Sequence, residues 1–303
     1  MSLLYKLKVI PKLINAYIFI LKNLIKNKKT ICFDISEIGY IEHIIEYIKI
    51  AERIHEVRIC ITTQDAYLKK KEILLIGHKI ISFRIIRFFY GVNLFITPQV
   101  HLKKPPGSYK IHVFHNQPIK YISFPKNLLI DIDEHFVWSP LMENWIKNML
   151  VTHGFNSKIT RIGNPRLDKQ LFSNKQKRLK QGQRLNNIFK IGYAPSWDPY
   201  LSLRSNGIDI IKKISSLKNS QIFLRLHPCS LVDKNNENFN LYTGGVNWVE
   251  KISSLNLPNV FFVNETSTIE YLKNIDVLIT DVSSISLDAI LINIPLVFFE
   301  TSK

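Results

Sequence analysis

The sequence predicts an α/β protein with two parallel-sheet domains that face a cleft, preceded by a basic amphipathic helix. Its 303 residues are more than one hydrophobic core usually serves, which indicates two domains. Short apolar runs alternate with helical patterns, which is typical of βαβ units around a parallel sheet. Residues 173–187 interrupt this alternation with a polar, basic stretch that has no acidic residue, which predicts a linker.

We expect residues 1–29 to form a basic amphipathic helix on a membrane surface. They contain seven lysines and no acidic residue, and the lysines at positions 8, 12, 22 and 26 lie opposite an apolar face. The longest uncharged stretch, residues 13–21, is too short to cross a bilayer core of ~30 Å. Lysines favour the anionic cytoplasmic leaflet. The alternative is a helix packed on its own domain with its lysine face in water. The apolar face comprises Leu3, Leu7, Ile10, Ile14, Tyr17, Leu21 and Leu24, with Ile18 and Ile25 beside it.

The first α/β domain is predicted over residues 30–172. Apolar residues at helical spacing predict one helix over Ile38–Ile54 and another over Pro140–Val151. Cys32 and Cys60 lie within β-rich runs, where we expect small buried side chains. The predicted strands are Thr30–Phe33, Val57–Ile61, Leu94–Thr97, Ile111–Phe114, Phe136–Trp138 and Lys158–Ile162.

A linker over residues 173–189 leads to a second domain over residues 190–303. Its helices are predicted at Gly207–Leu217, at Ser284–Ile292, and after Ser267, where Glu270 completes a capping box. Residues Asp233–Asn247 are predicted to form a loop. The chain ends directly after a predicted strand, so we expect this domain to be minimal or incomplete. The strands are Lys190–Ala194, Gln221–Leu226, Asn259–Val263, Val277–Thr280 and Leu296–Phe299.

Charge and motif content narrow the function. The 41 Lys and Arg residues against 24 Asp and Glu residues give a net charge of +17, which favours an anionic partner. Nucleic acid is not favoured, because the lysines concentrate in residues 1–29 and 173–187 without interleaved aromatic residues. The sequence contains no GxGxxG, Walker A or GxSxG motif, which argues against dinucleotide oxidoreductases, P-loop ATPases and α/β-hydrolases.

No cofactor is expected. The three cysteines are far apart and no zinc-ligand spacing occurs, so no metal site is predicted. A divalent cation is compatible with the sequence but not indicated by it. The pair of carboxylates in Asp131-Ile132-Asp133 is a weak match to a DxD cation motif, and a turn explains it equally well.

Two histidines follow predicted strands, at the edge where open α/β sheets bind ligands. His115 follows Ile111–Phe114, and an imidazole there suits general-base chemistry near neutral pH. A lone loop histidine is more often structural. His227 follows Arg225 at the end of another strand, and alternation predicts that both side chains lie on one side. Here the alternative is a histidine hydrogen-bonded to the loop.

Two further loops carry hydroxyls and an aromatic ring. Ser196 and Trp197 follow the first strand of the second domain, where the indole could equally be packing. Asp281, Ser283 and Ser284 join a strand to a helix, where hydroxyls and backbone N–H groups suit a phosphate. Capping of the helix is the commoner role of such residues, and the two roles are compatible.

Five segments together resemble one family, the CDP-glycerol glycerophosphotransferases of teichoic acid and capsule synthesis in bacteria, which have the GT-B fold. Each match alone is weak, but all five occur in the family's order. They are Phe114–Lys120 (similar to W-H-G-T-P-L-K), Gly163–Asp168 (G-Y-P-R-N-D), Tyr193–Trp197 (Y-A-P-T-W), Arg225–Pro228 (R-x-H-P) and Ile279–Ser284 (I-T-D-Y-S-S).

The resemblance implies two Rossmann-like domains and a transferase that moves glycerol phosphate from CDP-glycerol to a hydroxyl of a membrane-linked polymer or lipid, releasing CMP. It implies a peripheral enzyme on the cytoplasmic face of the plasma membrane. His115 and His227 would be catalytic, with His115 the general base on the acceptor-side domain. The second domain would bind the nucleotide donor. Donor-binding residues would be Ser196, Trp197, Arg225, Asp281, Ser283, Ser284 and Arg166.

Three other functions compete with this one. A nucleotide-sugar glycosyltransferase or a UDP-sugar 2-epimerase is the nearest, although the epimerases carry a glycine pair where this chain has Ser283-Ser284. The others are an anion-binding module and a scaffold protein of cell-envelope synthesis. The chain also departs from the family at Phe114, Asn116 and Gln117, beside the histidine that would act on the acceptor.

Overall fold

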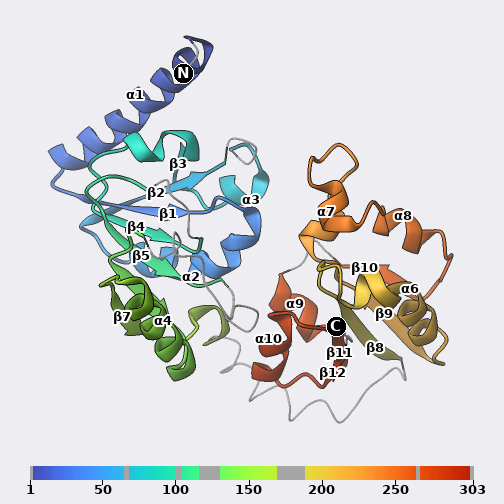
Figure 1. The fold of residues 1–303 in the computed structure, drawn as a ribbon. Helices are drawn as coiled ribbons and strands as arrows, with labels where there is room; N and C mark the ends of the chain where they lie inside the picture. Colours follow the sequence, from blue (N-terminus) through green and yellow to red (C-terminus); the bar gives the residue numbers. More distant parts are fainter. Residues whose placement is uncertain are drawn as a thin grey trace. The chain divides into compact units, whose positions relative to one another are not determined.

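The computed structural model describes residues 3–64, 68–99, 104–115, 130–168, 188–263 and 267–300 (Figure 1). The chain divides into two compact units, Met1–Arg166 and Leu167–Lys303. The predicted first domain ends at residue 172, and the predicted second domain begins at residue 190. Most of the predicted linker lies outside the described residues, and so do Asn116 and Gln117.

The first unit contains a parallel sheet of seven strands in the order β3-β2-β1-β4-β5-β6-β7. The order reverses between β1 and β4, which makes this a doubly wound fold with a switch point at that pair. The strands are β1 Lys29–Asp34, β2 Val57–Thr63, β3 Lys79–Ser82, β4 Leu94–Thr97, β5 Tyr109–Val113, β6 Glu134–Val137 and β7 Lys158–Arg161, and the helices are α1 Leu3–Ile25, η1 Ile38–Tyr40, α2 Ile41–Ala51, α3 Lys71–Leu74, η3 Phe83–Phe88 and α4 Pro140–His153.

Side chains on both faces of this sheet are buried. Alternation along β1 sends Phe33 to the face covered by α2, where it packs with Ile44 and Ile48. Cys32 points to the opposite face, where it packs with Cys60 and Phe89. Both cysteines are fully buried and free, as the sequence predicts.

Helix α1 packs one face on the first unit and leaves another face exposed. Ala16 and Ile20 join the cluster beneath η3, and the Tyr17 hydroxyl donates to the carbonyl of Phe88 at 2.7 Å. The amino-terminal end of the helix projects away from the unit (Figure 1). The exposed apolar side chains are Ile10, Ile14, Tyr17, Ile18, Leu21, Leu24 and Ile25.

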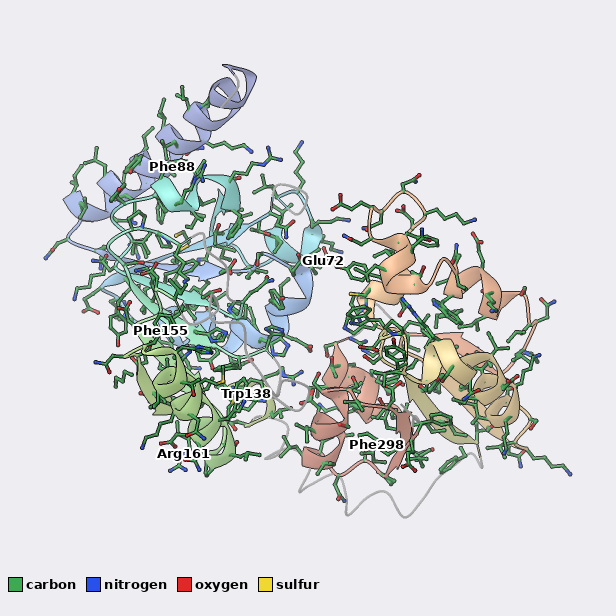
Figure 2. The ribbon with its side chains drawn as sticks, viewed as in Figure 1. Glu72, Phe88, Trp138, Phe155, Arg161 and Phe298 are labelled. Atoms are coloured by element: carbon green, nitrogen blue, oxygen red, sulfur yellow. The ribbon has the colours of Figure 1, made fainter. Side chains whose placement is uncertain are left out.

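Residues at the two ends of helix α4 determine where it begins and ends. The Ser139 hydroxyl accepts from the N–H of Met142, and Pro140 begins the first turn. Gly154 ends the helix in the left-handed conformation, with φ of 68°. Trp138 and Phe155 pack beside the helix at its two ends (Figure 2).

The second unit repeats this topology with five parallel strands in the order β10-β9-β8-β11-β12. Its switch point lies between β8 and β11. The strands are β8 Phe189–Ala194, β9 Ser220–Leu224, β10 Val260–Phe262, β11 Val277–Thr280 and β12 Leu296–Phe298, and the helices are α6 Ser202–Ser215, η6 Pro228–Leu231, α7 Phe239–Thr243, α8 Trp248–Ser253, α9 Thr268–Lys273 and α10 Ile285–Leu291.

Two clusters cover the two faces of this second sheet. Ile211 of α6 and Trp248 of α8 pack on one face with Tyr193. Helices α9 and α10 pack on the other. Gly192 of β8 lets α9 and the residues after it approach closely, because Tyr271 and Ile275 lie directly over its Cα.

The structure confirms the predicted α/β fold with parallel sheets and corrects several elements. The helix predicted over Ile38–Ile54 begins with a 3-10 turn and ends at Ala51. Strand β3 and the helical turns around it were not predicted. Within the loop predicted over Asp233–Asn247, residues Phe239–Thr243 form helix α7. Ser267 caps α9 as predicted, its hydroxyl accepting from the N–H of Glu270 at 3.2 Å.

The close packing over Gly192 leads to a stability prediction. A Cβ at this position would lie 2.5 Å from Cδ1 of Ile275 and 2.6 Å from the hydroxyl of Tyr271. We expect Gly192→Ala to lower the free energy of unfolding by about 1–3 kcal/mol through overpacking. Gly39→Ala is the control, because no atom lies within 4 Å of its Cβ position. Equal urea midpoints for the two variants would contradict the packing described.

Candidate functional site

The first unit presents His115 just beyond the carboxyl end of β5. Its Nδ1 lies 2.6 Å from the carbonyl oxygen of Pro98, beyond the end of the neighbouring strand β4. A carbonyl oxygen only accepts, so Nδ1 carries the proton and donates it. In the neutral ring, Nε2 is therefore the nitrogen with the free lone pair.

Burial keeps His115 neutral. It lowers the pKa of the ring below 6.5, and the hydrogen bond to Pro98 opposes this shift by stabilising the charged form. The ring of Tyr40 lies against it, with centroids 4.8 Å apart, and the ring of His43 meets it edge-on at 6.2 Å. At neutral pH the site thus offers an unprotonated imidazole between aromatic neighbours.

An ion pair completes this cluster. Nη1 of Arg166 lies 3.4 Å from Oε1 of Glu42, and Nε2 of His43 lies 3.8 Å from the same oxygen. Burial, the Arg166 guanidinium and His115 hold the pKa of His43 well below 6.5. The structure therefore groups Arg166 with His115 in the first unit.

Sequence reasoning missed Tyr40, Glu42 and His43. They lie in η1 and the first turn of α2, in the connection that follows β1. Because all strands of the sheet are parallel, the end of β1 lies at the same edge as the end of β5. A systematic inspection of every strand-to-helix connection would have found them.

In the second unit, His227 holds the opposite tautomer. Its Nδ1 accepts from the backbone N–H of Cys229 at 3.1 Å, so in the neutral ring the proton sits on Nε2. The residue caps the 3-10 turn η6, and strand β9 ends before it at Leu224. His227 can therefore act as a hydrogen-bond donor through Nε2, where His115 acts as an acceptor.

Trp197 lies beside His227, and Arg225 points elsewhere. The indole ring is 6.3 Å from the His227 ring and meets Tyr242 edge-on at 5.2 Å. The guanidinium of Arg225 donates to the carbonyl of Val263 at 3.3 Å and lies 5.7 Å from the ring of Tyr271. The predicted sharing of one strand side by Arg225 and His227 does not apply, since both residues follow the end of β9.

Asp281 ties together the loops at the second switch point. Its side chain is fully buried, and Oδ1 accepts from the N–H of Ser196 at 2.9 Å. Oδ2 accepts from the N–H and the hydroxyl of Ser202, at 3.0 Å and 2.6 Å. The carboxylate thus fixes the loop after β8 and the start of α6, and Ser196 is itself buried.

Ser283 and Ser284 lie between β11 and α10, where both are half-buried. The carbonyl of Ser283 accepts from the hydroxyl of Ser286 at 2.6 Å, and the carbonyl of Ser284 accepts from the N–H of Leu287 at 3.2 Å. These bonds hold the backbone at the carboxyl edge of the sheet, next to the loop that carries Trp197.

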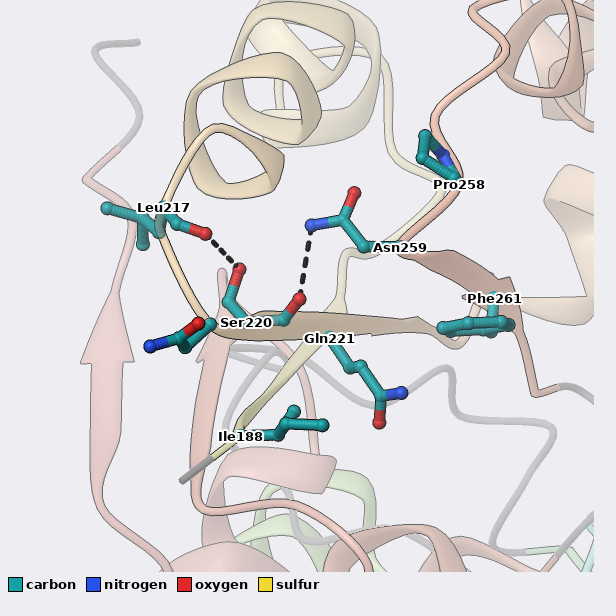
Figure 3. A pocket seen from close by; sticks show the side chains of 8 residues that line it. Ile188, Leu217, Ser220, Gln221, Pro258, Asn259 and Phe261 are labelled. Atoms are coloured by element: carbon teal, nitrogen blue, oxygen red, sulfur yellow. Dashed lines mark hydrogen bonds between the residues drawn. The ribbon is translucent and has the colours of Figure 1, made fainter. Parts of the chain in front are cut away.

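Two hollows, one in each unit, lie at the opposite edges of the sheets, where the strands begin. One of about 320 Å³ lies at the amino edge of the second sheet, lined by Ile188, Ser220 and Asn259 (Figure 3). One of about 340 Å³ lies at the amino edge of the first sheet, beside Val57 and Lys79. Neither contains a predicted site residue.

The Asp131 and Asp133 carboxylates are also at an amino edge. Asp131 pairs with Nζ of Lys110 at 2.9 Å, and Oδ2 of Asp133 accepts from the N–H of Lys110 at 2.7 Å. Asp131 has φ of 57°, as in a turn. Across the described ranges, no three His, Cys, Asp or Glu side chains gather as metal ligands.

Comparison with known proteins identifies the family. A family model described as CDP-Glycerol:Poly(glycerophosphate) glycerophosphotransferase matches residues 17–303. No curated protein matches the chain.

Solved structures share the fold. The wall teichoic acid polymerase TagF, soaked with CDPG, has 16% identity and a TM-score of 0.53, over 94% of this chain and 78% of that chain. UDP-GlcNAc 2-epimerase from Neisseria meningitidis, bound to UDP-GlcNAc, has 12% identity and a TM-score of 0.61, over 91% of this chain and 83% of that chain. S. aureus MnaA with UDP has 11% identity and a TM-score of 0.57, over 90% of this chain and 79% of that chain.

These structures belong to GT-B glycosyltransferases and epimerases, so their likeness establishes the GT-B fold of the chain. The family model extends through both units, from the middle of α1 to the last residue. The protein therefore belongs to the CDP-glycerol:poly(glycerophosphate) glycerophosphotransferase family and is a transferase with CDP-glycerol as its donor.

Proposed function

We propose that the first unit activates the acceptor and the second unit binds the donor, so that glycerol phosphate passes from CDP-glycerol to a hydroxyl of a membrane-linked polymer. The observation that carries this division is the pair of opposite tautomers. Nε2 of His115 has a free lone pair, whereas Nε2 of His227 carries a proton. Nε2 of His115 can therefore act as a base, and Nε2–H of His227 can donate a hydrogen bond to phosphate oxygens.

In this mechanism Nε2 of His115 takes the proton of the acceptor hydroxyl. The acceptor oxygen attacks the phosphorus that bears glycerol, and the bond from this phosphorus to the oxygen of CMP breaks. CMP leaves with that oxygen. The Pro98 carbonyl then stabilises the protonated His115 ring through Nδ1–H. Phosphoryl transfer depends mainly on such positioning and on neutralising the phosphate oxygens.

The residues that we assign to the donor lie in loops at the carboxyl edge of the second sheet. We assign the pyrophosphate to Nε2–H of His227 and to the hydroxyls of Ser283 and Ser284. The Trp197 ring offers an apolar face to the nucleoside. Asp281 supports these groups indirectly, because both of its oxygens already accept from Ser196 and Ser202.

Arg225 and Arg166 take different places in this proposal. Arg225, in the loop after β9, stabilises the second unit. Its guanidinium donates to the carbonyl of Val263 and lies over the ring of Tyr271. Arg166 lies beside Glu42 and His43, in the cluster next to His115, where an acceptor with phosphate groups would approach. We therefore assign Arg166 to the acceptor and Arg225 to the support of the second unit.

Helix α1 would hold the enzyme on the anionic cytoplasmic face of the membrane, beside its acceptor. Six apolar side chains of the helix besides Tyr17 are exposed, and Lys22 and Lys26 are exposed as well. None of the helices in the described residues is long and apolar enough to span a bilayer. An interfacial helix of this kind gains from apolar burial and from about 1 kcal/mol for each lysine near anionic lipid.

The base assignment is tested by His115→Ala. We expect turnover to fall by ~10²–10⁴, the usual loss when a general base is removed, with the KM for CDP-glycerol nearly unchanged. The assay follows label from CDP-glycerol into membranes together with CMP release. His55→Ala, a change at an exposed histidine of the same unit, is the control.

The lowered pKa of His115 sets the direction of the pH dependence. The neutral ring is the active form, so kcat/KM is retained above its pKa and lost as the pH falls through it. The midpoint of this acid limb should lie below 6.5. Undiminished turnover in His115→Ala, or an acid limb that persists in that variant, would rule out His115 as the base.

Membrane attachment is tested by replacing two exposed residues of α1, Ile14 and Leu21, with Asp. These side chains are 56% and 57% exposed, so the fold should tolerate the change. We expect at least about tenfold weaker binding to phosphatidylglycerol vesicles in sedimentation, since burying each apolar side chain contributes ~1.5–3 kcal/mol. Leu141→Asp, at a 79% exposed residue of α4, is the control. Equal binding by all three proteins would show that α1 does not face the membrane.

A further inference from the structure

A buried carboxylate lies close to the group that holds His115. Asp34 ends β1 and Thr97 ends the neighbouring strand β4, where the strand order of the first sheet reverses. The Thr97 hydroxyl donates to Oδ2 of Asp34 at 2.7 Å, and both residues are 0% exposed. The catalytic steps proposed for His115 use neither side chain, although burying a carboxylate is costly. Thr97 directly precedes Pro98, whose carbonyl is the partner of His115.

The Thr97 hydroxyl also holds the peptide that follows Pro98. Its Oγ1 accepts from the N–H of Gln99 at 3.2 Å, and its proton lies within reach of the Gln99 carbonyl as well. The N–H of Gln99 and the carbonyl of Pro98 belong to one planar peptide unit. This peptide is trans, so the two groups point in opposite directions. By holding the N–H, Thr97 therefore fixes the direction of the Pro98 carbonyl.

Little else in this turn can rotate. The proline ring fixes φ of Pro98, so the direction of its carbonyl depends on the rotation about the bond from Cα to the carbonyl carbon. The hydrogen bond from the Gln99 N–H to Thr97 fixes that rotation. On the other side of the turn, the Ser36 hydroxyl donates to Oε1 of Gln99 at 3.2 Å. Pro98 and Ser36 are both buried, so this turn is part of the packed interior.

A continuous series of contacts thus runs from Asp34 to the histidine. It passes from Oδ2 of Asp34 to the Thr97 hydroxyl, across the peptide between Pro98 and Gln99, and from the Pro98 carbonyl to Nδ1 of His115 at 2.6 Å. Hydrogen bonds in such a series polarise one another. A hydroxyl that donates to a carboxylate is a better acceptor for the N–H, and the peptide carbonyl becomes a better acceptor for Nδ1–H.

We propose that Asp34 and Thr97 are positioning residues for His115. They hold the Pro98 carbonyl in place, so that it keeps the proton of His115 on Nδ1 and leaves Nε2 free for the acceptor hydroxyl. Neither side chain is exposed to a substrate, and both act through the peptide after Pro98. This inference rests on the proposed role of His115 as the base.

The test compares two substitutions of Thr97. Thr97→Val keeps the shape of the side chain but removes its hydroxyl, and Thr97→Ser keeps the hydroxyl. We expect Thr97→Val to lower kcat by about 10–100-fold, the scale for a misplaced catalytic group, with the KM for CDP-glycerol within about twofold. Thr97→Ser should recover most of the loss.

Thr63→Val is the matched control. Thr63 is also 0% exposed and lies at the carboxyl end of β2, but its hydroxyl has no hydrogen-bond partner among the described residues. We expect its kcat to stay within about twofold of the wild-type value, because no contact leads from this hydroxyl to Pro98.

A double variant separates positioning from stability. If Thr97 acts through His115, adding Thr97→Val to His115→Ala should cause no further loss of turnover, since linked residues are not additive. Asp34→Ala, compared with Asp34→Asn, makes the same test from the far end of the series if Thr97→Val does not fold, because Asn keeps an oxygen that can accept from Thr97. CDP-glycerol binding and thermal unfolding report which variants are folded.

The outcomes distinguish this inference from the proposed function. Wild-type kcat in folded Thr97→Val or Asp34→Ala, together with inactive His115→Ala, would overturn the positioning role alone. An additive loss in the double variant, or a Thr97→Ser as slow as Thr97→Val, would also overturn it. An active His115→Ala would instead overturn the proposed function.

Discussion

The hydrogen bond from Nδ1 of His115 to the carbonyl of Pro98 fixes the chemistry of the first unit. A ring held in this way can only offer a lone pair at Nε2, and burial keeps it neutral. Pro98 lies beyond β4 and His115 beyond β5, so two neighbouring parallel strands bring the two groups together. In the second unit the direction of the hydrogen bond is reversed, because the backbone N–H of Cys229 donates to Nδ1 of His227.

Both units stabilise their switch points with a buried carboxylate. In the first, Oδ2 of Asp34 at the end of β1 accepts from the hydroxyl of Thr97 at the end of β4, at 2.7 Å. In the second, Asp281 after β11 accepts from Ser196 after β8. Strand order reverses at both places, so the loops there have no covering crossover and are open to a ligand. A fully buried carboxylate fixes such loops in one position.

The sequence was informative where a local pattern decides the structure. The boundaries of Leu94–Thr97 and Val277–Thr280 were predicted correctly, because each is a short β-rich run between turn residues. Strand β3 was missed because its apolar residues run on into η3 without alternation, and α7 was missed because its surroundings are rich in Asn. The prediction that His115 and His227 lie beyond the ends of strands is confirmed, and their roles stay predictions.

The remainder of the site depends on strand order, which no local pattern contains. Tyr40 and His43 are brought to His115 by the parallel sheet, through strands distant in the sequence. The burial of Asp281 could not be predicted either. The sequence does not distinguish a carboxylate that accepts from backbone N–H groups from one that contacts a ligand. Burial is a property of packing, and it decides between these roles.

The opposite tautomers of His115 and His227 can be measured directly by ¹H–¹⁵N NMR of the full chain with ¹⁵N-labelled histidine at pH 7.5. His115→Gln and His227→Gln would assign the two imidazoles by the signals that each removes. We expect His115 to carry its proton on Nδ1 and His227 to carry its proton on Nε2. A His115 protonated on Nε2, or the same tautomer at both residues, would contradict the division of base and donor-binding roles between the two units.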